Sequence, residues 1–329
     1  MLLKFSLLAL VLSAGSAEQV EHADFHAVVD KALTHVRSGA QLWIDGEAPA
    51  KPEGAGGCVS CHVVTFDIWS HNAAALRDFQ IDRVKLAETF DWSLLAANDD
   101  DQERTVEQLR ELGGKENDQI AQMLLARLPD DERPWIPLYR DMLVALQKDD
   151  GRWNAGGQLP GQKRPKPETV EVTTMWSLLA IASVAETEAA ESAIERGFKS
   201  LDNERAGVST EWWVVRMLCE QECGDPKRVD HWRQALLSRQ REDGGWGWLC
   251  DDPSDALATG QALYGLRRAG VSTDHPAIVK ARRFLVDTQR EDGTWPVNGT
   301  KADKKDREQW TSVYWGAAWS VIGLCEAAE

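Results

Sequence analysis

Apolar residues recur along most of the chain at the three- and four-residue spacing of α-helices, and no useful stretch alternates with the period of two that marks a strand. Two kinds of helical segment alternate. Amphipathic segments precede polar turns, whereas other segments are apolar nearly all round, as expected for helices buried on both sides. The second kind comprises residues 172–185, 209–221, 256–269 and 310–327. The pattern predicts an all-α protein in which exposed and buried helices alternate.

A repeated turn follows three amphipathic segments: LVALQKDDGRW (143–153), LLSRQREDGGW (236–246) and FLVDTQREDGTW (284–295). The glycine ends each helix in a left-handed conformation, so the tryptophan folds back onto the helix end. Gln147, Gln240 and Gln289 are placed to bond free carbonyls there. The last two glutamines are 49 residues apart and the first two 93, about two periods. A degenerate unit is therefore expected between them, with Asn203 in the place of glutamine.

The N-terminal part follows the same plan more loosely: its first outer segment ends at Trp43, and its second pair lacks the tryptophan turn. Residues 25–43 and 58–76 form one outer and inner pair, and residues 82–97 and 103–128 form another. Head-to-tail pairs of this kind bury their apolar faces on their neighbours and close into a barrel. The predicted fold is an all-α (α/α)6 toroid of about twelve helices, with the first helix of each pair outside and the second inside.

The first residues, MLLKFSLLALVLSAGSAEQ, have the basic start, short apolar core and small residues of a secretory signal peptide, with cleavage expected after Ala17. No later stretch is apolar enough to cross a membrane. We therefore expect a periplasmic or otherwise exported protein without an integral membrane span. Its expected organisation is a signal peptide in 1–17, N-terminal helical pairs in 18–135 and repeat-bearing pairs completing the toroid in 136–329.

The net charge of the chain limits the kinds of partner that it is expected to bind. The formal net charge is −16, and no basic face is visible. Nucleic acids and anionic membranes need such a face, so neither is an expected partner. The short basic run at Lys301, Lys304 and Lys305 is flanked by acids and is interpreted as a solvated loop.

KARRFLVDTQREDGTW (280–295) resembles the QW motif of squalene and terpene cyclases, and the two earlier repeats match it in part. The resemblance implies the toroid that those cyclases share with protein prenyltransferase β subunits. Cyclase chemistry would need a DxDD motif, and none of the acidic runs, such as CDDPSD (250–255), has that pattern. Cys250, Asp255 and His275 contain the atoms of a prenyltransferase zinc site but no recognisable motif. Neither activity is therefore expected from the resemblance alone.

The segment CVSCH places Cys58, Cys61 and His62 within five residues. This is the attachment signature of c-type haem, in which each thiol adds to a vinyl group and the histidine binds the iron. Attachment takes place outside the cytoplasm, in agreement with the predicted signal peptide. A disulfide between the two cysteines or a zinc site are the alternatives. Residues 56–90 also resemble exported bacterial proteins that join a CVSCH-type cytochrome motif to a squalene-cyclase-like domain, which supports one covalent haem c on one toroid.

The second axial ligand of the iron remains open among His26, His35 and Met175. His71 lies nine residues after His62, roughly 13 Å along a straight helix, and is too distant to bind the same iron. Side chains near the starts of the inner helices are candidates to surround the macrocycle, although most such aromatics serve as core. They are Met175, Trp212, Trp213, Trp310 and Trp315.

The remaining cysteines, Cys219, Cys223, Cys250 and Cys325, allow one or two disulfides in an exported protein. Cys219 and Cys223 are one helical turn apart, which favours cross-pairing with Cys250 or Cys325 over a bond between them.

The main hypothesis is an exported haem protein in electron transfer or redox sensing, with a redox protein as candidate partner. The principal alternative is an enzyme or binding protein for a hydrophobic or isoprenoid small molecule in the toroid cavity. A haem-free binding scaffold is a third class. No residue is assigned a catalytic role, and the absence of DxDD weighs against an enzyme.

Overall fold

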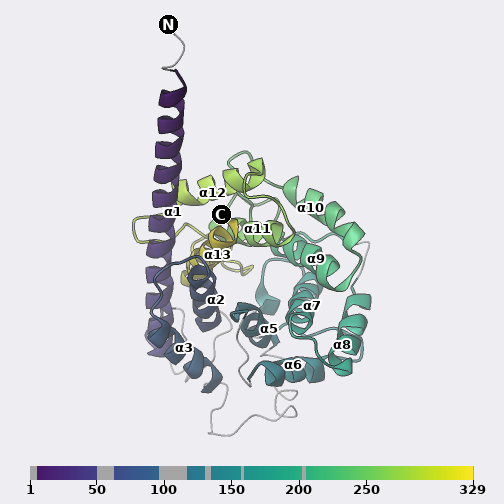
Figure 1. Cartoon of the computed structure of the whole chain (residues 1–329). Helices are drawn as coiled ribbons and strands as arrows, with labels where there is room; N and C mark the ends of the chain where they lie inside the picture. The colour runs from purple at the N-terminus through teal and green to yellow at the C-terminus, as the bar shows by residue number, and fades with distance from the viewer. Residues whose placement is uncertain are drawn as a thin grey trace.

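The computed structural model describes residues 6–49, 63–95, 117–129, 135–156, 159–201 and 205–328, with side chains from residue 25 onward except those of 94–95. These residues form twelve α-helices in two concentric rings (Figure 1). The outer helices are α1 (Ser6–Ile44), α3 (Arg83–Leu95), α6 (Trp135–Leu146), α8 (Glu188–Lys199), α10 (Val229–Leu237) and α12 (Pro276–Thr288). The inner helices are α2 (Val64–Ala75), α5 (Asn117–Ala126), α7 (Lys166–Ala182), α9 (Thr210–Cys223), α11 (Ala256–Arg268) and α13 (Trp310–Ala327).

The predicted (α/α)6 toroid is confirmed. Within the described residues there are isolated bridges but no strand, and two short 3-10 turns, η1 (Leu159–Gly161) and η2 (Pro226–Arg228), complete the helical content. Both predicted segments, 18–135 and 136–329, supply helices to one ring, while the boundary between them stays a prediction. Asn203 lies outside the described residues.

The burial of each helix follows the hydrophobic pattern. On the outer helix α12 only one stripe is buried, consisting of Ala277, Ile278, Ala281 and Leu285. On the inner helix α11 every residue from Ala256 to Leu266 is buried. An inner helix contacts neighbours on both sides as well as its outer partner, so it has no solvent face to make polar.

The repeated turns have the predicted structure. Trp153, Trp246 and Trp295 are 0%, 0% and 1% exposed. Each indole N–H donates to a carbonyl ten residues earlier, those of Leu143, Leu236 and Leu285, at 2.8–2.9 Å. The turn glycines Gly151, Gly244 and Gly293 have φ of +83°, +90° and +83°. The turns therefore lock each outer helix to the segment that enters the next inner helix.

The same turns join neighbouring pairs. Gln147 and Gln240 each donate to the glycine carbonyl of their own turn and to a carbonyl of the next outer helix, Ala193 in α8 and Ala277 in α12. Gln289 donates to Gly293 and to Val28 in α1. The last outer helix is thereby tied to the first, and α13 packs against both α11 and α2, which closes the ring.

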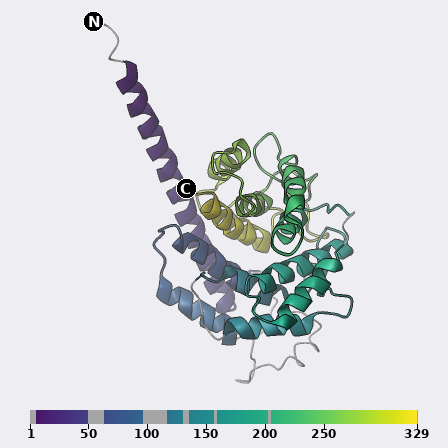
Figure 2. The same ribbon diagram turned by 45° about the vertical axis from the view of Figure 1, so that its right-hand side comes forward.

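Helix α1 is longer than the predicted segment 25–43 and extends beyond the ring at its N-terminal end (Figure 2). It begins at Ser6, inside the predicted signal peptide, so cleavage after Ala17 stays a prediction. None of the described helices is both long and apolar enough to cross a bilayer.

The expected disulfides are absent among the described cysteines, because Cys219, Cys223, Cys250 and Cys325 are all free thiols. Cys219 is buried on α9, where its thiol donates to the carbonyl of Met175 at 3.4 Å. Cys325 is buried on α13, on the other side of α11. The expected cross-pairing is therefore wrong for these four residues, which the helices hold in separate packing environments.

Candidate functional site: a cavity at the mouth of the toroid

A cavity of about 460 Å³ opens between the start of α13 and the end of α1. We call it the mouth cavity. Its lining includes Trp43, Leu159, Trp310, Thr311, Ser312 and Trp315, together with the loop before α13. Trp43 and Trp310 lie nearly parallel, with ring centroids 6.2 Å apart and an interplanar angle of 17°. The cavity therefore has flat aromatic surfaces supplied by both ends of the chain.

Backbone pairing holds the remaining wall in place. The N–H of Lys163 donates to the carbonyl of Thr300 at 2.8 Å, and that of Ala302 donates to Gly161 at 3.2 Å. This brings Lys301 and Lys304 to the cavity lining. The interpretation of this basic run as a solvated loop is therefore incomplete, since Lys301 and Lys304 line the mouth cavity.

A smaller space of about 30 Å³ lies deeper in the ring, and we call it the base pocket. All six inner helices line it, through the side chains of Phe66, Asp118, Gln122, Val172, Trp176, Glu211, Leu257, Gln261, Trp315 and Trp319. It shares Leu159, Gln162 and Trp315 with the mouth cavity. The two spaces are thus adjacent, with a wide entrance and a narrow floor that each combine aromatic and polar side chains.

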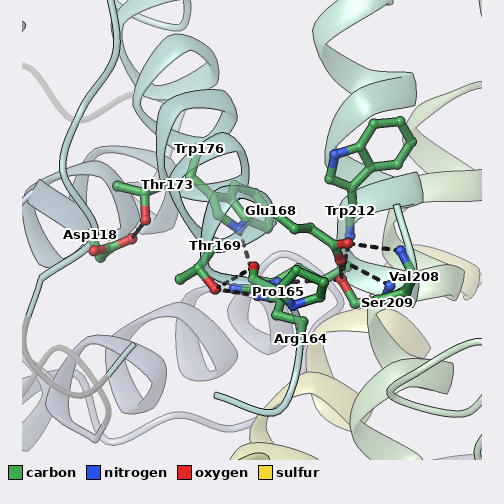
Figure 3. Close-up of polar contacts among 11 residues, drawn as sticks. Asp118, Arg164, Pro165, Glu168, Thr169, Thr173, Trp176, Val208, Ser209 and Trp212 are labelled. Carbon is green, nitrogen blue, oxygen red and sulfur yellow. Dashed lines mark hydrogen bonds and ion pairs between the residues drawn. The ribbon is translucent and has the colours of Figure 1, made fainter. Parts of the chain in front are cut away.

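Asp118, in the first turn of α5, is the most deeply buried acid of the base pocket. Its carboxylate accepts a hydrogen bond from the Thr173 hydroxyl at 2.9 Å (Figure 3). It also accepts one from the Gly156 N–H at 3.3 Å. Burial raises the pKa of Asp118 to about 6, although these two hydrogen bonds act in the opposite direction. The group is therefore placed to change protonation near neutral pH.

Arg164 and Glu211 form a paired charge beside Asp118. The Arg164 guanidinium donates to Glu211 Oε2 at 2.7 Å, and the Trp176 indole N–H donates to Glu211 Oε1 at 2.9 Å. Arg164 also donates to the hydroxyl of Thr169 at 3.3 Å (Figure 3). Both oxygens of Glu211 are thus held, and its charge is balanced by Arg164.

Three glutamines of the base pocket, unlike these carboxylates, have side-chain oxygens without a hydrogen-bond partner among the described residues. The side-chain oxygens of Gln122, Gln162 and Gln261 are buried and have no hydrogen-bond donor within the described structure. Gln162 and Gln261 are only 7% and 3% exposed. Buried acceptors are normally paired with a donor from protein or water, so the floor of the cavity has unused capacity to accept hydrogen bonds.

The predicted haem residues Cys58, Cys61 and His62 lie outside the described residues. The next residue, Val63, is buried, and its carbonyl accepts a hydrogen bond from the Tyr314 hydroxyl at 2.9 Å. Tyr314 stacks on Trp310, which lines the mouth cavity. The first described residue after the motif is therefore connected to the cavity wall.

The three candidates for the second axial ligand are dispersed. His26 stacks on Phe79 with a centroid distance of 4.5 Å, and the pKa of His35 is lowered by burial, partly offset by Asp292. Met175 is fully buried on α7. None of the three lines the mouth cavity or the base pocket, and the assignment of a second ligand stays a prediction.

Of the other residues expected near a macrocycle, Trp310 and Trp315 line the mouth cavity. Trp212 and Trp213 instead pack against Trp232, with centroid distances of 5.6 and 5.8 Å. No group of three or more potential metal-binding side chains occurs among the described residues, so Cys250, Asp255 and His275 do not form a zinc site there. Asp255 caps α11 and His275 caps α12.

Sequence reasoning missed Asp118, Gln122, Gln162 and Gln261. They are far apart in the sequence and belong to no motif, and only closure of the ring brings them to one pocket. The clue that was available is that polar residues sit in otherwise apolar inner helices, as Gln261 does in ALATGQALYGL (256–266).

Residues 206–293 match the family described as the squalene-hopene cyclase N-terminal domain. A squalene hopane cyclase of Aspergillus fumigatus is 41% identical over 61 residues, which cover 18% of this chain and 8% of that protein. The squalene–hopene cyclase of Zymomonas mobilis is 35% identical over 112 residues, 32% of this chain and 16% of that protein. The chain therefore carries a squalene/terpene cyclase-like region but spans a small part of the length of these relatives.

Solved structures resemble the whole ring. A possible GH105 family member from Salmonella enterica has a TM-score of 0.54 at 16% identity, covering 92% of this chain and 93% of that chain. Unsaturated glucuronyl hydrolase from Bacillus sp. GL1 has a TM-score of 0.56 at 11% identity, covering 91% and 96%. At these identities the likeness establishes the α/α toroid and nothing about chemistry.

Proposed function

We propose that the toroid is a binding protein or enzyme for an apolar small molecule of the isoprenoid class, held in the mouth cavity. The observation that carries this proposal is the cavity of about 460 Å³ with aromatic walls that leads to a floor lined by all six inner helices. Concave, largely preformed spaces that combine apolar surfaces with placed polar groups are typical ligand sites. Here Trp43, Trp310 and Trp315 supply the apolar surfaces. The cyclase-like region at 206–293 supports an isoprenoid as the class of ligand.

If the site is catalytic, Asp118 is its candidate acid or base. It borders the base pocket, and burial raises its pKa to about 6, close to the range where a side chain exchanges protons efficiently. The paired Glu211 is held by two donors and is the poorer candidate. This role does not depend on a DxDD motif.

Titration with farnesene, followed by tryptophan fluorescence, tests the proposal because Trp43, Trp310 and Trp315 line the cavity. Thr311→Trp places a large side chain in the cavity lining and should weaken binding at least about tenfold, equivalent to about 1.4 kcal/mol. Thr288→Trp, at an exposed position of α12, should leave binding unchanged. Binding that Thr311→Trp does not affect, or no binding to the wild type, would refute the assignment.

A second candidate function is that of a c-type haem protein, and one observation favours it. Val63, directly after the CVSCH motif, is anchored through Tyr314 to the wall of the mouth cavity. The described residues fit such a group, because Trp43, Trp310 and Trp315 offer flat apolar surfaces and Lys301 and Lys304 are cations suited to its carboxylates. When bound, the haem would supply one-electron chemistry.

In this candidate function Cys58 and Cys61 hold the group covalently and His62 supplies an axial nitrogen. Export through residues 1–17 brings the chain to the compartment where attachment occurs, and a redox protein is the partner.

The haem hypothesis is tested by expression in a host with a c-type maturation system. The purified chain should retain a peroxidase stain in denaturing electrophoresis, and Cys58→Ala with Cys61→Ala should abolish it, whereas Cys250→Ala should not. His62→Ala should shift the Soret band. A colourless wild-type protein from that host would eliminate this second function while leaving the isoprenoid proposal in place.

A further inference from the structure

Three glutamines that line the base pocket have side-chain oxygens without a donor in the part of the chain that the structure describes. Gln122 belongs to α5, Gln162 to the segment after η1 and Gln261 to α11, and all three residues line the same space of about 30 Å³. A buried acceptor without a donor is costly. Three such acceptors on residues around one pocket, from three separate segments, fit a site that is completed by a ligand carrying several hydrogen-bond donors.

The charges around this pocket leave one carboxylate without a cation of its own. Arg164 is paired with Glu211 at 2.7 Å, so together they are nearly neutral. Asp118 is bonded only to a hydroxyl and a backbone N–H, and no cation forms an ion pair with it in the described structure. When Asp118 is ionised, the pocket therefore has a net negative charge, which favours a cation over an anion.

The walls of the pocket also suit a cation. Phe66, Trp176, Trp315 and Trp319 line it, and the faces of aromatic rings attract positive charge. The remaining lining is apolar, from Leu159, Val172, Trp248 and Leu257. These groups can surround an apolar chain that passes from the mouth cavity to the floor.

We propose that the base pocket binds the ammonium group of a primary amine whose apolar body occupies the mouth cavity. An ammonium has three N–H donors for the three glutamine oxygens, and the Asp118 carboxylate balances its charge. A hydroxyl has one donor and would leave two acceptors unpaired. A guanidinium has five N–H donors, two more than the three oxygens can accept one to one. This inference rests on the proposed isoprenoid site and adds the chemistry of the ligand's end group.

Three probes that share one apolar body separate the two proposals: farnesylamine, farnesol and farnesene. We expect the wild type at pH 8 to bind farnesylamine at least about tenfold more tightly than the other two, equivalent to about 1.4 kcal/mol. If farnesene binds and the amine binds no better, the ammonium site is refuted and the apolar site stands. If none of the three binds, both proposals fail.

Two variants test the residues. Gln122→Met with Gln261→Met, at two positions that line the base pocket and not the mouth cavity, should weaken farnesylamine binding at least about tenfold and leave farnesene binding unchanged, since two acceptors are lost and the volume is kept. Asp118→Asn, which is isosteric, should weaken the amine alone. Gln234→Met, exposed on α10, is the matched control. Variants with wild-type helix content and wild-type amine affinity would overturn the proposal, as would a crystal structure grown with farnesylamine in which the three oxygens are bonded only to ordered water.

Discussion

Two sets of three glutamines distinguish the rim of the toroid from its interior. The rim glutamines, Gln147, Gln240 and Gln289, each donate two hydrogen bonds and join consecutive outer helices. The pocket glutamines, Gln122, Gln162 and Gln261, each keep a buried oxygen without a donor. The rim is therefore complete as a structure. Within the described residues the pocket still has acceptors without donors, which is why we propose it as the ligand-binding part of the ring.

The largest expected effect distinguishes a rim tryptophan from a cavity tryptophan. Trp295 is 1% exposed and donates to Leu285, so Trp295→Ala should reduce the free energy of unfolding by about 3–5 kcal/mol. Trp315 borders both cavity spaces and is only partly buried, so Trp315→Ala should cost about half as much and weaken farnesene binding. Chemical denaturation of both variants checks this, and equal losses would contradict the distinction.

Asp118 should make the stability of the pocket depend on pH. Its folded pKa of about 6 is above the usual 3.8, so the folded state favours the protonated acid. The free energy of unfolding should therefore fall as the pH rises from about 4 through 6, and Asp118→Asn should remove this part of the slope. The difference between wild type and variant should change by about 3 kcal/mol between pH 4 and pH 8. If the difference in the free energy of unfolding between wild type and Asp118→Asn is the same at every pH, burial does not raise the pKa of Asp118.

Replacing the glycine of a repeated turn should destabilise the fold. Gly244 has φ of +90°, and a Cβ there would lie 2.6 Å from the carbonyl oxygen of Lys280. Gly244→Ala should cost at least about 2 kcal/mol, from left-handed strain and the displaced backbone. Gly270 has a similar φ of +81° with nothing within 4 Å of a Cβ, so Gly270→Ala should cost only about 1 kcal/mol. If the two variants lower the melting temperature equally, the short distance between Gly244 and the Lys280 carbonyl does not contribute to the cost.

The smallest effect compares the two sets of glutamines directly. Gln240→Met leaves the carbonyls of Gly244 and Ala277 without this donor and should destabilise the fold by about 1–3 kcal/mol. Gln261→Met removes an acceptor that has no donor, so the unliganded protein should be unchanged or slightly more stable. Urea denaturation without ligand checks both, and a loss in Gln261→Met as large as that in Gln240→Met would mean that the pocket glutamine is a structural residue.

The sequence predicted the ring because its repeats are local. The helix, glycine turn and tryptophan lie within about a dozen residues. The spacing alone therefore predicts that Gln240 bonds the turn and that Trp246 packs on the helix end. The cavity was not predictable in this way. Asp118, Gln162 and Gln261 come from three distant segments, and their meeting depends on ring closure through Gln289 and α1. The roles of Cys58, Cys61 and His62 stay predictions from their motif.

We infer that a ligand supplies the hydrogen-bond donors for the three glutamine oxygens of the base pocket. A high-resolution crystal structure grown with farnesylamine would show whether it does. We expect the amine nitrogen within about 3 Å of the side-chain oxygens of Gln122, Gln162 and Gln261, with its apolar chain beside Trp315 in the mouth cavity. An empty mouth cavity with ordered waters bonded to all three oxygens would contradict the account, because the pocket would then be completed by solvent.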